Sequence, residues 1–477
     1  MSARTTARTV APGAGVSTAR VAVEGDLWLV LGDPLPNRVF FDCGIVEQLR
    51  ALLGERLVPV FPLHRKHIEP WLGRLEGLHV LEGDELIPYR VPLGERVVRR
   101  ADIFLDRRIG LYPLAIRHSQ RNGFHEGRWL RGHYHTFLDP EQAGRLPRWE
   151  RLESAMFAWH FSRRRYAPAV LLERMRDGCG RLVVTNLQAQ NATPFLIAAR
   201  RLGIDAVGYV ASWDHTVGKG VVSPHLDRYV VQNDTMRADL ERYHHIDPAK
   251  IVVTGWPQTD IFHRRYSQGI YHDLLRDLGM DVAKPVVLYA GNTPTNSPYE
   301  GNVVTRLVEW WTLHARDRFS LLFRPHPRDK KVGERFARAL AEDGVGVQAA
   351  SYTDIGDLAL LLQHVDCVVA NAGTVLLDAL VNDRPAVCVL YDDGAPAGQA
   401  WAQLNVVGDH YRELADSGAF YRAESFEDLV GGIERSLAQP LELEAERSRV
   451  SASTVGVVDG LAAQRVAEAI VGPLGSG

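Results

Sequence analysis

Short apolar runs alternate with longer amphipathic stretches along most of this chain, and this alternation constrains the fold more than any other feature of the sequence. The runs are almost continuously apolar, which is typical of parallel strands buried on both faces, and the stretches between them have helical spacing. The series occurs twice, before and after a polar segment at 261–284. The sequence therefore predicts an α/β fold of two Rossmann-like, doubly wound domains in tandem.

The individual elements follow from the same pattern. The predicted strands are 26–32, 56–62, 181–185, 206–210, 226–231 and 251–254 in the first series, and 285–290, 319–323, 345–348, 366–369 and 386–390 in the second. The predicted helices include 40–54, 149–177, 332–342 and 457–470. Most of residues 63–148 show no clear period and receive no assignment.

Four parts of the chain follow from these elements. Residues 1–22 lack an apolar segment and predict a disordered tail. Residues 23–270 are predicted to form the first domain and residues 271–445 the second. The last helix lies in 446–477, and we expect it to pack back on the first domain.

Composition disfavours several classes of protein. The chain has 477 residues, of which 46% are hydrophobic and 24% charged, as in an ordinary globular protein. A net charge of -3 disfavours electrostatic binding to nucleic acid. No apolar run reaches the length of about 18 residues that crosses a membrane, and the four scattered cysteines form no CxxC pair. We therefore expect a cytoplasmic protein without a nucleic-acid partner or a transmembrane segment; peripheral membrane contact stays open.

Polar loops follow three strands of the second domain, at the end of the strands where open parallel sheets bind their ligands. Loop 291–296 consists of small residues whose backbone amides can approach a ligand. Arg324 can hold phosphate oxygens bidentately, and the turn before Thr374 begins a helix whose N-terminus favours an anion. The predicted donor-binding residues are Gly291, Asn292, Thr293, Arg324, His326, Asn371, Gly373, Thr374 and Asp378.

Each of these loops also has a plainer interpretation. Loop 291–296 can be a simple turn, Arg324 can form a structural ion pair, and Thr374 can serve only as a helix cap. Asp378 can accept hydrogen bonds from ribose hydroxyls or face a neighbouring helix. Three phosphate-compatible loops after strands of one domain favour a nucleotide diphosphate ligand.

The first domain offers one loop, 211–220, in which reactive side chains are dense. Its candidate acceptor-site residues are Trp213, Asp214, His215, Thr216 and Lys219. Either His215 or Asp214 can deprotonate an acceptor hydroxyl, because an imidazole or a carboxylate can act as a general base. The alternative is a salt-bridged structural loop. Asp42, after the first predicted strand, is a third candidate for catalysis or a residue near a helix cap.

Metal ligation has little support in the sequence. His133 and His135 form a pair without an evident third ligand. Asp392 and Asp393 are adjacent, but no phosphate-compatible loop accompanies them. We therefore expect no metal and no other cofactor.

The motifs of this chain and their order along it resemble those of GT-B glycosyltransferases, particularly the branch that is similar to the CDP-glycerol glycerophosphotransferases of teichoic acid synthesis. The resemblance covers about residues 180–410 and leaves the chain before them unmatched. It implies two domains facing one cleft, with the donor on the second and the acceptor on the first. The residues that carry it are Trp213-Asp214-His215-Thr216, Lys219-Gly220, Leu226-Asp227-Arg228-Tyr229-Val230, Val253-Thr254-Gly255-Trp256-Pro257-Gln258-Thr259-Asp260, Arg324-Pro325-His326-Pro327 and Ala370-Asn371-Ala372-Gly373-Thr374.

Two departures from the family pattern bear on the reaction. The teichoic-type enzymes have W-H-G-T-P-x-K, whereas Asp214 precedes His215 here, so the base stays open between these two residues. They have D-Y-S-S where this chain has Asn371-Ala372-Gly373-Thr374, which keeps a hydroxyl but not the acid. The second departure argues against glycerol phosphate as the transferred group.

The expected activity is transfer of a sugar from a nucleotide diphosphate-sugar to a hydroxyl-bearing acceptor, with inversion and without a metal. The acceptor can be a glycan, a lipid-linked molecule or a small metabolite. A CDP-alditol phosphotransferase and a UDP-sugar 2-epimerase are the alternatives with the same fold. A non-catalytic nucleotide-sugar binding protein is the alternative from another class.

Overall fold

The structure is a computed structural model of the chain. It describes residues 22–62, 68–87, 93, 97, 167–187, 191–218, 222–349, 355–397, 399–406, 411, 414 and 416–474. The chain divides into two compact units. Gly15–Pro257 and Leu461–Gly477 belong to the N-terminal unit, and Gln258–Gly460 to the C-terminal unit. The division after Pro257 lies before the predicted boundary at 270.

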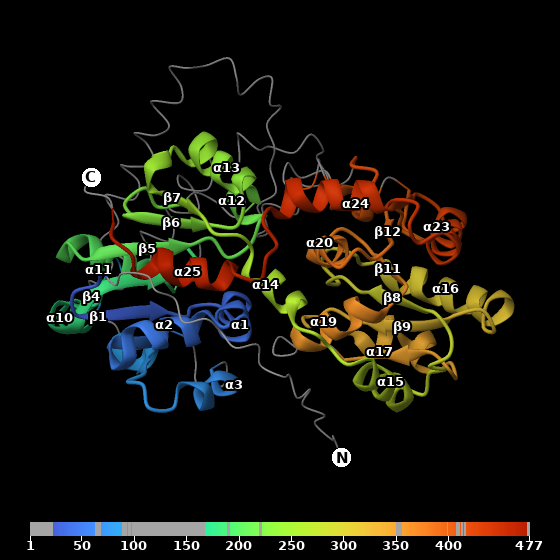
Figure 1. Cartoon of the computed structure of the whole chain (residues 1–477), viewed down its shortest axis with the longest axis horizontal. Coiled ribbons are helices and arrows are strands. Elements are labelled where there is room, and N and C mark those ends of the chain that lie inside the picture. The colour runs from blue at the N-terminus through green and yellow to red at the C-terminus, as the bar shows by residue number, and fades with distance from the viewer. Residues whose placement is uncertain are drawn as a thin grey trace. The chain divides into compact units, whose positions relative to one another are not determined.

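The described part of the N-terminal unit contains a seven-stranded sheet in the order β3-β2-β1-β4-β5-β6-β7 (Figure 1). All neighbouring strands are parallel. The chain runs outward from β1 to β3 and then returns to β4 beside β1, so the strand order reverses between β1 and β4. The strands are β1 (Asp26–Val30), β2 (Leu57–Phe61), β3 (Leu81–Glu82), β4 (Cys179–Val184), β5 (Asp205–Tyr209), β6 (Arg228–Val231) and β7 (Ile251–Val253).

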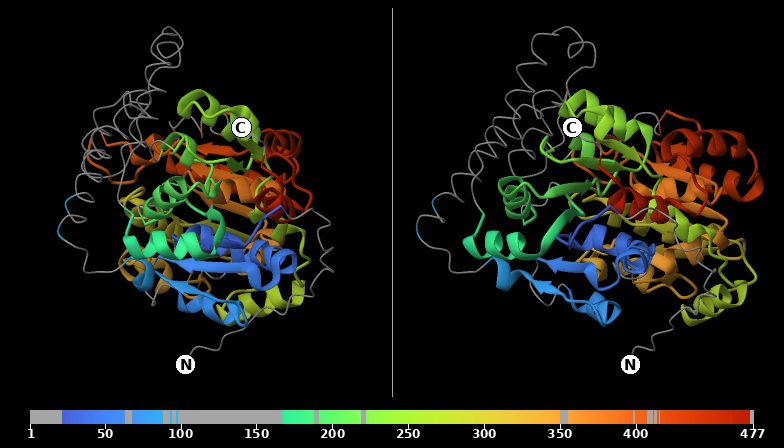
Figure 2. Two further views of the ribbon diagram at one scale, coloured as in Figure 1. Left: turned by 90° about the vertical axis from the view of Figure 1, so that its left-hand side faces the viewer. Right: turned by 60° about the vertical axis from the view of Figure 1, so that its left-hand side comes forward.

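Helices cover both faces of this sheet (Figure 2). Right-handed crossovers that run in opposite directions along a sheet place their helices on opposite faces, which separates α1 and α2 from α11. Pro34 and the N-cap Asp33, whose side chain accepts from Leu35 N, start α1. The helices are α1 (Pro34–Asp42), α2 (Ile45–Leu53), α3 (Glu69–Leu72), α4 (Gly83–Leu86), α10 (Ala169–Gly178), α11 (Thr193–Leu202), α12 (His215–Gly218), α13 (Asp234–His244) and α25 (Ala462–Val471).

The last helix, α25, packs against α2 in the N-terminal unit, as expected (Figure 1). The buried guanidinium of Arg181 in β4 donates to the carbonyls of Ile470 and Gly472, both at 2.9 Å. Ala22 N donates to Val471 O at 2.8 Å, so Ala22 belongs to the fold and not to the predicted tail. The crossing segment begins at Leu461, because the chain from 446 to 460 belongs to the C-terminal unit.

The C-terminal unit has a six-stranded parallel sheet among its described residues, in the order β10-β9-β8-β11-β12-β13. Its strand order reverses between β8 and β11. Every residue of β8 and β9 is buried, because helices cover the sheet on both faces. The strands are β8 (Val286–Ala290), β9 (Ser320–Arg324), β10 (Gly346–Val347), β11 (Cys367–Ala370), β12 (Ala386–Val389) and β13 (Tyr421–Ala423).

The helices of this unit pack their apolar sides on a core that includes Val287, Phe323, Val369 and Leu429. Among the described residues, no helix is both long enough and apolar enough to span a membrane. The helices are α14 (Pro257–Asp260), which begins at the division between the units, α15 (Gln268–Asp277), α16 (Glu300–His314), α17 (Val332–Arg335), α18 (Ala337–Leu340), α19 (Ile355–His364), α20 (Thr374–Val381), α21 (Trp401–Leu404), α23 (Phe426–Ala438) and α24 (Glu444–Val450).

Several predicted elements need correction. The helix predicted at 40–54 is two helices, α1 and α2, because Gly44 adopts a left-handed φ of 88° between them. The helix predicted at 332–342 is α17 and α18, which Phe336 separates. The polar segment 261–284 contains α15. Of the helix predicted at 149–177, only the part from Ala169 falls among the described helices, and 149–166 lies outside the described residues.

Candidate functional site

The three predicted donor-binding loops follow β8, β9 and β11, which are neighbours in the C-terminal sheet. Because these strands are parallel, their carboxyl ends lie at one edge of the sheet. The loops after β8 and β11 flank the reversal of strand order, where open α/β sheets form the crevice that binds ligands. The fold therefore brings together three loops that the sequence predicted one at a time.

Hydrogen bonds join two of these loops directly. Asn292 Nδ2 donates to Asn371 Oδ1 at 3.3 Å and to Ala372 O at 3.2 Å. Asn371 Oδ1 also accepts from Asn405 Nδ2 at 2.6 Å, while Asn371 Nδ2 donates to Val389 O at 2.6 Å. The buried Asn371 amide is thus used within the protein. In the structure it connects the loops, and a direct contact of Asn371 with the donor stays a prediction.

Gly291 and Gly373, the two glycines of these loops, differ in the space that surrounds them. A Cβ at Gly291 would lie 3.0 Å from Phe336 Cζ and 3.3 Å from Pro325 Cα, so any larger residue would force these neighbours to shift. Gly373 has extended backbone, and a Cβ there would meet nothing nearer than Asn371 O at 3.8 Å. Space is therefore available beside Gly373 at the start of α20.

The N-terminus of α20 lacks the cap by Thr374 that the sequence offered as an alternative. The N-cap residue is Gly373, which offers no side-chain oxygen, and Thr374 is the first helical residue. Thr374 is therefore not the helix cap. An N-terminus without a side-chain cap keeps amide groups and the positive end of the helix dipole for a ligand. This arrangement favours an anion at Gly373–Thr374.

Arg324 is the last residue of β9 and not a loop residue, and it is 7% exposed. Its carbonyl accepts from Gly291 N at 2.9 Å, which ties the ends of β8 and β9 together. The half-buried His326 accepts a hydrogen bond from Arg328 N at Nδ1, at 3.0 Å. Because Nδ1 is the acceptor, a neutral ring carries its proton on Nε2 and donates from there. A guanidinium and an imidazole donor thus come from one strand end.

Asp378 lies within α20 and is 1% exposed. Its two carboxylate oxygens accept from Gln258 Nε2 of α14, at 2.9 and 3.0 Å. Asp378 thus faces a neighbouring helix, which is one of the two alternatives that the sequence left open. A contact with ribose stays a prediction, because each carboxylate oxygen can accept a second hydrogen bond beside the one from Gln258.

A buried ionic cluster that the sequence did not predict supports the loop after β8. Arg335 Nη2 donates to Glu300 Oε2 at 2.6 Å and to Ser297 O at 2.8 Å, and its Nη1 donates to Asp329 and Asn292. Glu300 also accepts from Asn292 N at 2.9 Å. Burial raises the pKa of Glu300 to about 7, although Arg335 and the Asn292 amide act in the opposite direction. Two carboxylates share one guanidinium, so burial favours a proton on one of them.

Glu300→Gln tests this cluster by its effect on the pH dependence of stability. A carboxyl whose pKa is raised from 4.5 to about 7 binds protons more tightly in the folded state. The free energy of unfolding of the wild type should therefore fall, by up to about 3 kcal/mol, as pH rises through this interval. Urea denaturation should show Glu300→Gln gaining stability relative to the wild type between pH 5 and pH 8. A difference that stays constant with pH would contradict the raised pKa.

In the N-terminal unit, the predicted reactive loop follows β5 and contains α12. His215 and Trp213 are each 7% exposed, and Asp214 between them is half-buried. His215 N donates to Ser212 O at 3.0 Å, so a turn precedes the helix. Thr216 has no exposed surface, and its hydroxyl donates to Asp239 Oδ2 at 2.6 Å. Thr216 thus has a structural role in the loop, and its contact with the acceptor stays a prediction.

The remaining candidates divide between described and undescribed residues. Asp42 ends α1 and forms an ion pair with Arg74 at 2.7 Å. Lys219, His133 and His135 lie outside the described residues.

Asp392 and Asp393 have separate partners within the C-terminal unit. Asp392 Oδ2 accepts from Ala402 N at 2.8 Å, and Asp393 pairs with Arg306 at 3.6 Å. The two carboxylates are thus engaged in different contacts.

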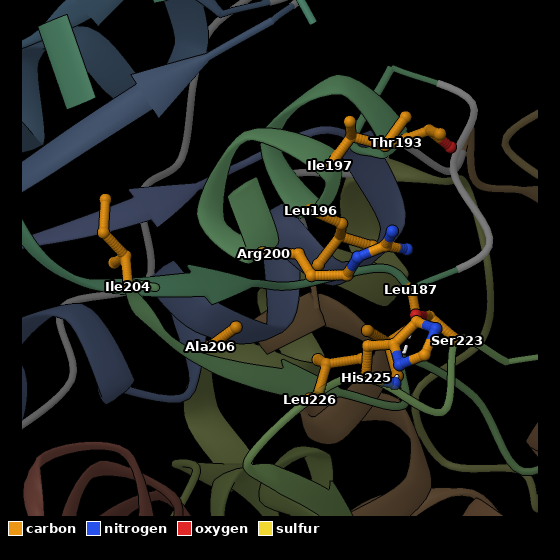
Figure 3. Close-up of a pocket in the computed structure, with 10 residues that line it drawn as sticks. All are labelled: Leu187, Thr193, Leu196, Ile197, Arg200, Ile204, Ala206, Ser223, His225 and Leu226. Atoms are coloured by element: carbon orange, nitrogen blue, oxygen red, sulfur yellow. Dashed lines mark hydrogen bonds between the residues drawn. The ribbon is translucent and has the colours of Figure 1, made fainter. Parts of the chain in front are cut away.

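A pocket opens in the N-terminal unit between α11, the start of β5 and the segment 222–226 (Figure 3). Aliphatic side chains form most of its wall, and Figure 3 shows Arg200 and His225 beside it. None of the predicted site residues lines this pocket. Its lining residues are Leu187, Thr193, Leu196, Ile197, Arg200, Ile204, Ala206, Ser223, His225 and Leu226.

Two parallel-sheet α/β units, the second with polar loops at its switch point, define the GT-B class of fold. Solved structures share it across nearly the whole chain. UDP-GlcNAc 2-epimerase from Neisseria meningitidis, bound to UDP-GlcNAc, has 10% identity and a TM-score of 0.52, with 93% of this chain and 98% of that chain covered. A putative UDP-N-acetylglucosamine 2-epimerase from Listeria monocytogenes has 12% identity and a TM-score of 0.52, with 93% and 95% covered.

The sequence model of the CDP-glycerol:poly(glycerophosphate) glycerophosphotransferase family matches residues 183–472, which is more than half of the chain. The chain belongs to this family and is an enzyme of the transferase class. The match confirms the resemblance inferred from the motifs. No curated protein matches the chain.

Proposed function

We propose that this protein is a glycosyltransferase that moves a sugar from a nucleotide diphosphate-sugar to a hydroxyl-bearing acceptor. The observation that carries the proposal is the convergence of Arg324, His326 and the N-terminus of α20 at the carboxyl edge of the C-terminal sheet. These are preorganised donors for a departing diphosphate, and such donors act most strongly on charge that develops in the transition state.

The reaction assigns a role to each unit. The acceptor hydroxyl attacks the anomeric carbon, and His215 or Asp214 of the N-terminal unit accepts its proton. The bond between the anomeric carbon and the diphosphate oxygen breaks, and the nucleoside diphosphate leaves with the electron pair. Direct attack on the face opposite the leaving group inverts the anomeric configuration.

A CDP-alditol phosphotransferase is the second candidate, and the family match favours it. In that reaction the acceptor attacks phosphorus, and the nucleoside monophosphate leaves. Asn371 argues for sugar transfer, because an amide committed to structural contacts stands where the teichoic-type enzymes have an acid. A UDP-sugar 2-epimerase is a third candidate, although the likeness to solved epimerases shows only the fold.

Ligand-induced stabilisation tests the proposed donor class. A ligand that binds only the folded state stabilises it by about 2.7 kcal/mol at 100 times its Kd. Differential scanning fluorimetry with UDP-, GDP-, CDP- and TDP-sugars and with CDP-glycerol should show the largest increase in Tm for one group of nucleotide-sugars. A shift with CDP-glycerol alone would contradict the proposal and favour the second candidate.

Activity without a metal is a further expectation. The proposed reaction relies on Arg324, His326 and helix amides to neutralise the diphosphate. The adjacent carboxylates of Asp392 and Asp393 each have a different partner in the protein. Turnover should therefore survive an excess of EDTA over any trace metal. Loss of turnover that Mn²⁺ or Mg²⁺ restores would contradict this expectation and implicate Asp392 and Asp393.

A further inference from the structure

The loop that carries His215 is held by side chains of another helix, α13. Thr216, which directly follows His215, donates its hydroxyl to Asp239 Oδ2 at 2.6 Å. The backbone carbonyl of Thr216 accepts from His244 Nε2, also at 2.6 Å. Both the side chain and the main chain of one loop residue are thus bonded to α13.

His244 bonds the chain at a second point as well. Val222 N donates to His244 Nδ1 at 3.0 Å, so one imidazole connects the backbone at Thr216 with the backbone at Val222. A carbonyl can only accept and an amide N–H can only donate. The ring must therefore be neutral, with its proton on Nε2 and its lone pair on Nδ1. At 1% exposure His244 is screened from competing water, which strengthens both bonds.

The helix that supplies these groups is itself well anchored. Asn233 caps α13 by accepting from Met236 N at 2.8 Å, and Met236 and Leu240 are buried. The helix packs against β6, β7 and α12. A rigid platform of this kind can hold a side chain to the tolerance that general-base catalysis needs.

We propose that Asp239 and His244, acting through Thr216 and Val222, are positioning residues that hold His215 and Asp214 for proton abstraction. This inference rests on the proposed function, since it assigns the loop a catalytic task. Neither residue touches the reacting atoms. Their effect is on the rate of the chemical step and not on donor binding, which belongs to the C-terminal unit.

Two graded series of variants test the inference. His244→Phe keeps a ring but removes both hydrogen bonds, whereas His244→Asn restores an acceptor for Val222 N. Thr216→Val removes the hydroxyl with little change of shape, whereas Thr216→Ser retains it. We expect kcat to fall about 10- to 100-fold in His244→Phe and Thr216→Val. His244→Asn and Thr216→Ser should recover part of the loss, and donor KM should change less than twofold throughout.

Glu241→Gln is the matched control on the same helix, because Glu241 forms a solvent-exposed ion pair with Arg237 at 3.3 Å. Its kcat should equal that of the wild type. Circular dichroism and thermal unfolding check that each variant folds. Variants that fold but lose donor affinity along with kcat would overturn the positioning role.

Amide hydrogen exchange separates this inference from the proposed function, because it needs no substrate. Exchange in peptides covering 212–225 should accelerate at least tenfold in His244→Phe and stay unchanged in Glu241→Gln. Unchanged exchange in His244→Phe would show that the hydrogen bonds of His244 do not hold the loop. Faster exchange with normal kcat would show that these hydrogen bonds are not important for catalysis. If exchange accelerates in His244→Phe as predicted but the wild type transfers no sugar, the proposed function is overturned, and with it the catalytic task assigned to these hydrogen bonds.

Discussion

His215→Ala is expected to lower kcat by about 10²- to 10⁴-fold, the range over which a positioned general base typically acts. His215 starts α12 within the loop after β5, and its backbone is held by Ser212 and its neighbour Thr216 by Asp239. Donor affinity should stay nearly constant, because the groups predicted to bind the donor lie in the C-terminal unit. Steady-state kinetics with donor titration measure both quantities.

Asp214→Asn and a control histidine sharpen this test. If Asp214 only orients the imidazole, Asp214→Asn should cost less than His215→Ala. His79→Ala, at an exposed position of the same unit, should leave kcat unchanged. Near-normal kcat in His215→Ala together with an inactive Asp214→Asn would reverse the two roles. If both variants stay active, the base is elsewhere, and Asp42 is the next candidate despite its ion pair with Arg74.

Removing the guanidinium of Arg324 is expected to weaken nucleotide binding by roughly 2–4 kcal/mol, which is about 30- to 1,000-fold in Kd. The loss reflects a charge-assisted and bidentate contact with the diphosphate. Because Arg324 is buried at the end of β9, alanine would leave a void there. Arg324→Met fills the space without the charge, and Arg324→Lys keeps the charge without the planar fork. Isothermal titration calorimetry should rank the affinities wild type, then lysine, then methionine.

Arg318→Ala provides the matched control, because Arg318 belongs to the same unit and forms an exposed ion pair with Glu434 at 2.7 Å. Exposed pairs of this kind contribute little to stability, so its nucleotide affinity and its Tm should both stay close to those of the wild type. A folded Arg324→Met variant that binds nucleotide as tightly as Arg318→Ala would exclude Arg324 from the donor site.

The central strands and the edge strands β7 and β10 were predicted from sequence, whereas the edge strands β3 and β13 were not. Strands such as β8 and β9 are buried along their whole length, and burial on both faces produces a continuous apolar run. The strands β3 and β13 have only two and three residues, and each contains a charged residue, so neither forms an apolar run. They exist because a neighbouring strand supplies hydrogen-bond partners, which is information that a local pattern does not contain.

The candidate site was also predicted only in part from the sequence. Its loops could be predicted because each contains glycine, asparagine or arginine directly after an apolar run. The side chains that hold the loops could not, because their partners are distant in the sequence. Arg335 is 35 positions from Glu300, and His244 is 28 positions from Thr216. From sequence alone, Glu300 indicates only an acidic residue in the first turn of a helix.

The most direct test of the central claim is to identify which bond of the donor breaks. In water enriched in ¹⁸O, slow transfer to water reports the site of attack without knowledge of the natural acceptor. The donor that gives the largest increase in Tm is incubated with the enzyme, and mass spectrometry locates the label. A glycosyltransferase should release a nucleoside diphosphate that carries no ¹⁸O, because water then attacks the anomeric carbon and the diphosphate keeps its own oxygens; the diphosphate is the diagnostic product, since the anomeric oxygen of a free sugar also exchanges with water. Label on a phosphate, with release of a nucleoside monophosphate, would contradict sugar transfer and establish phosphotransfer in its place.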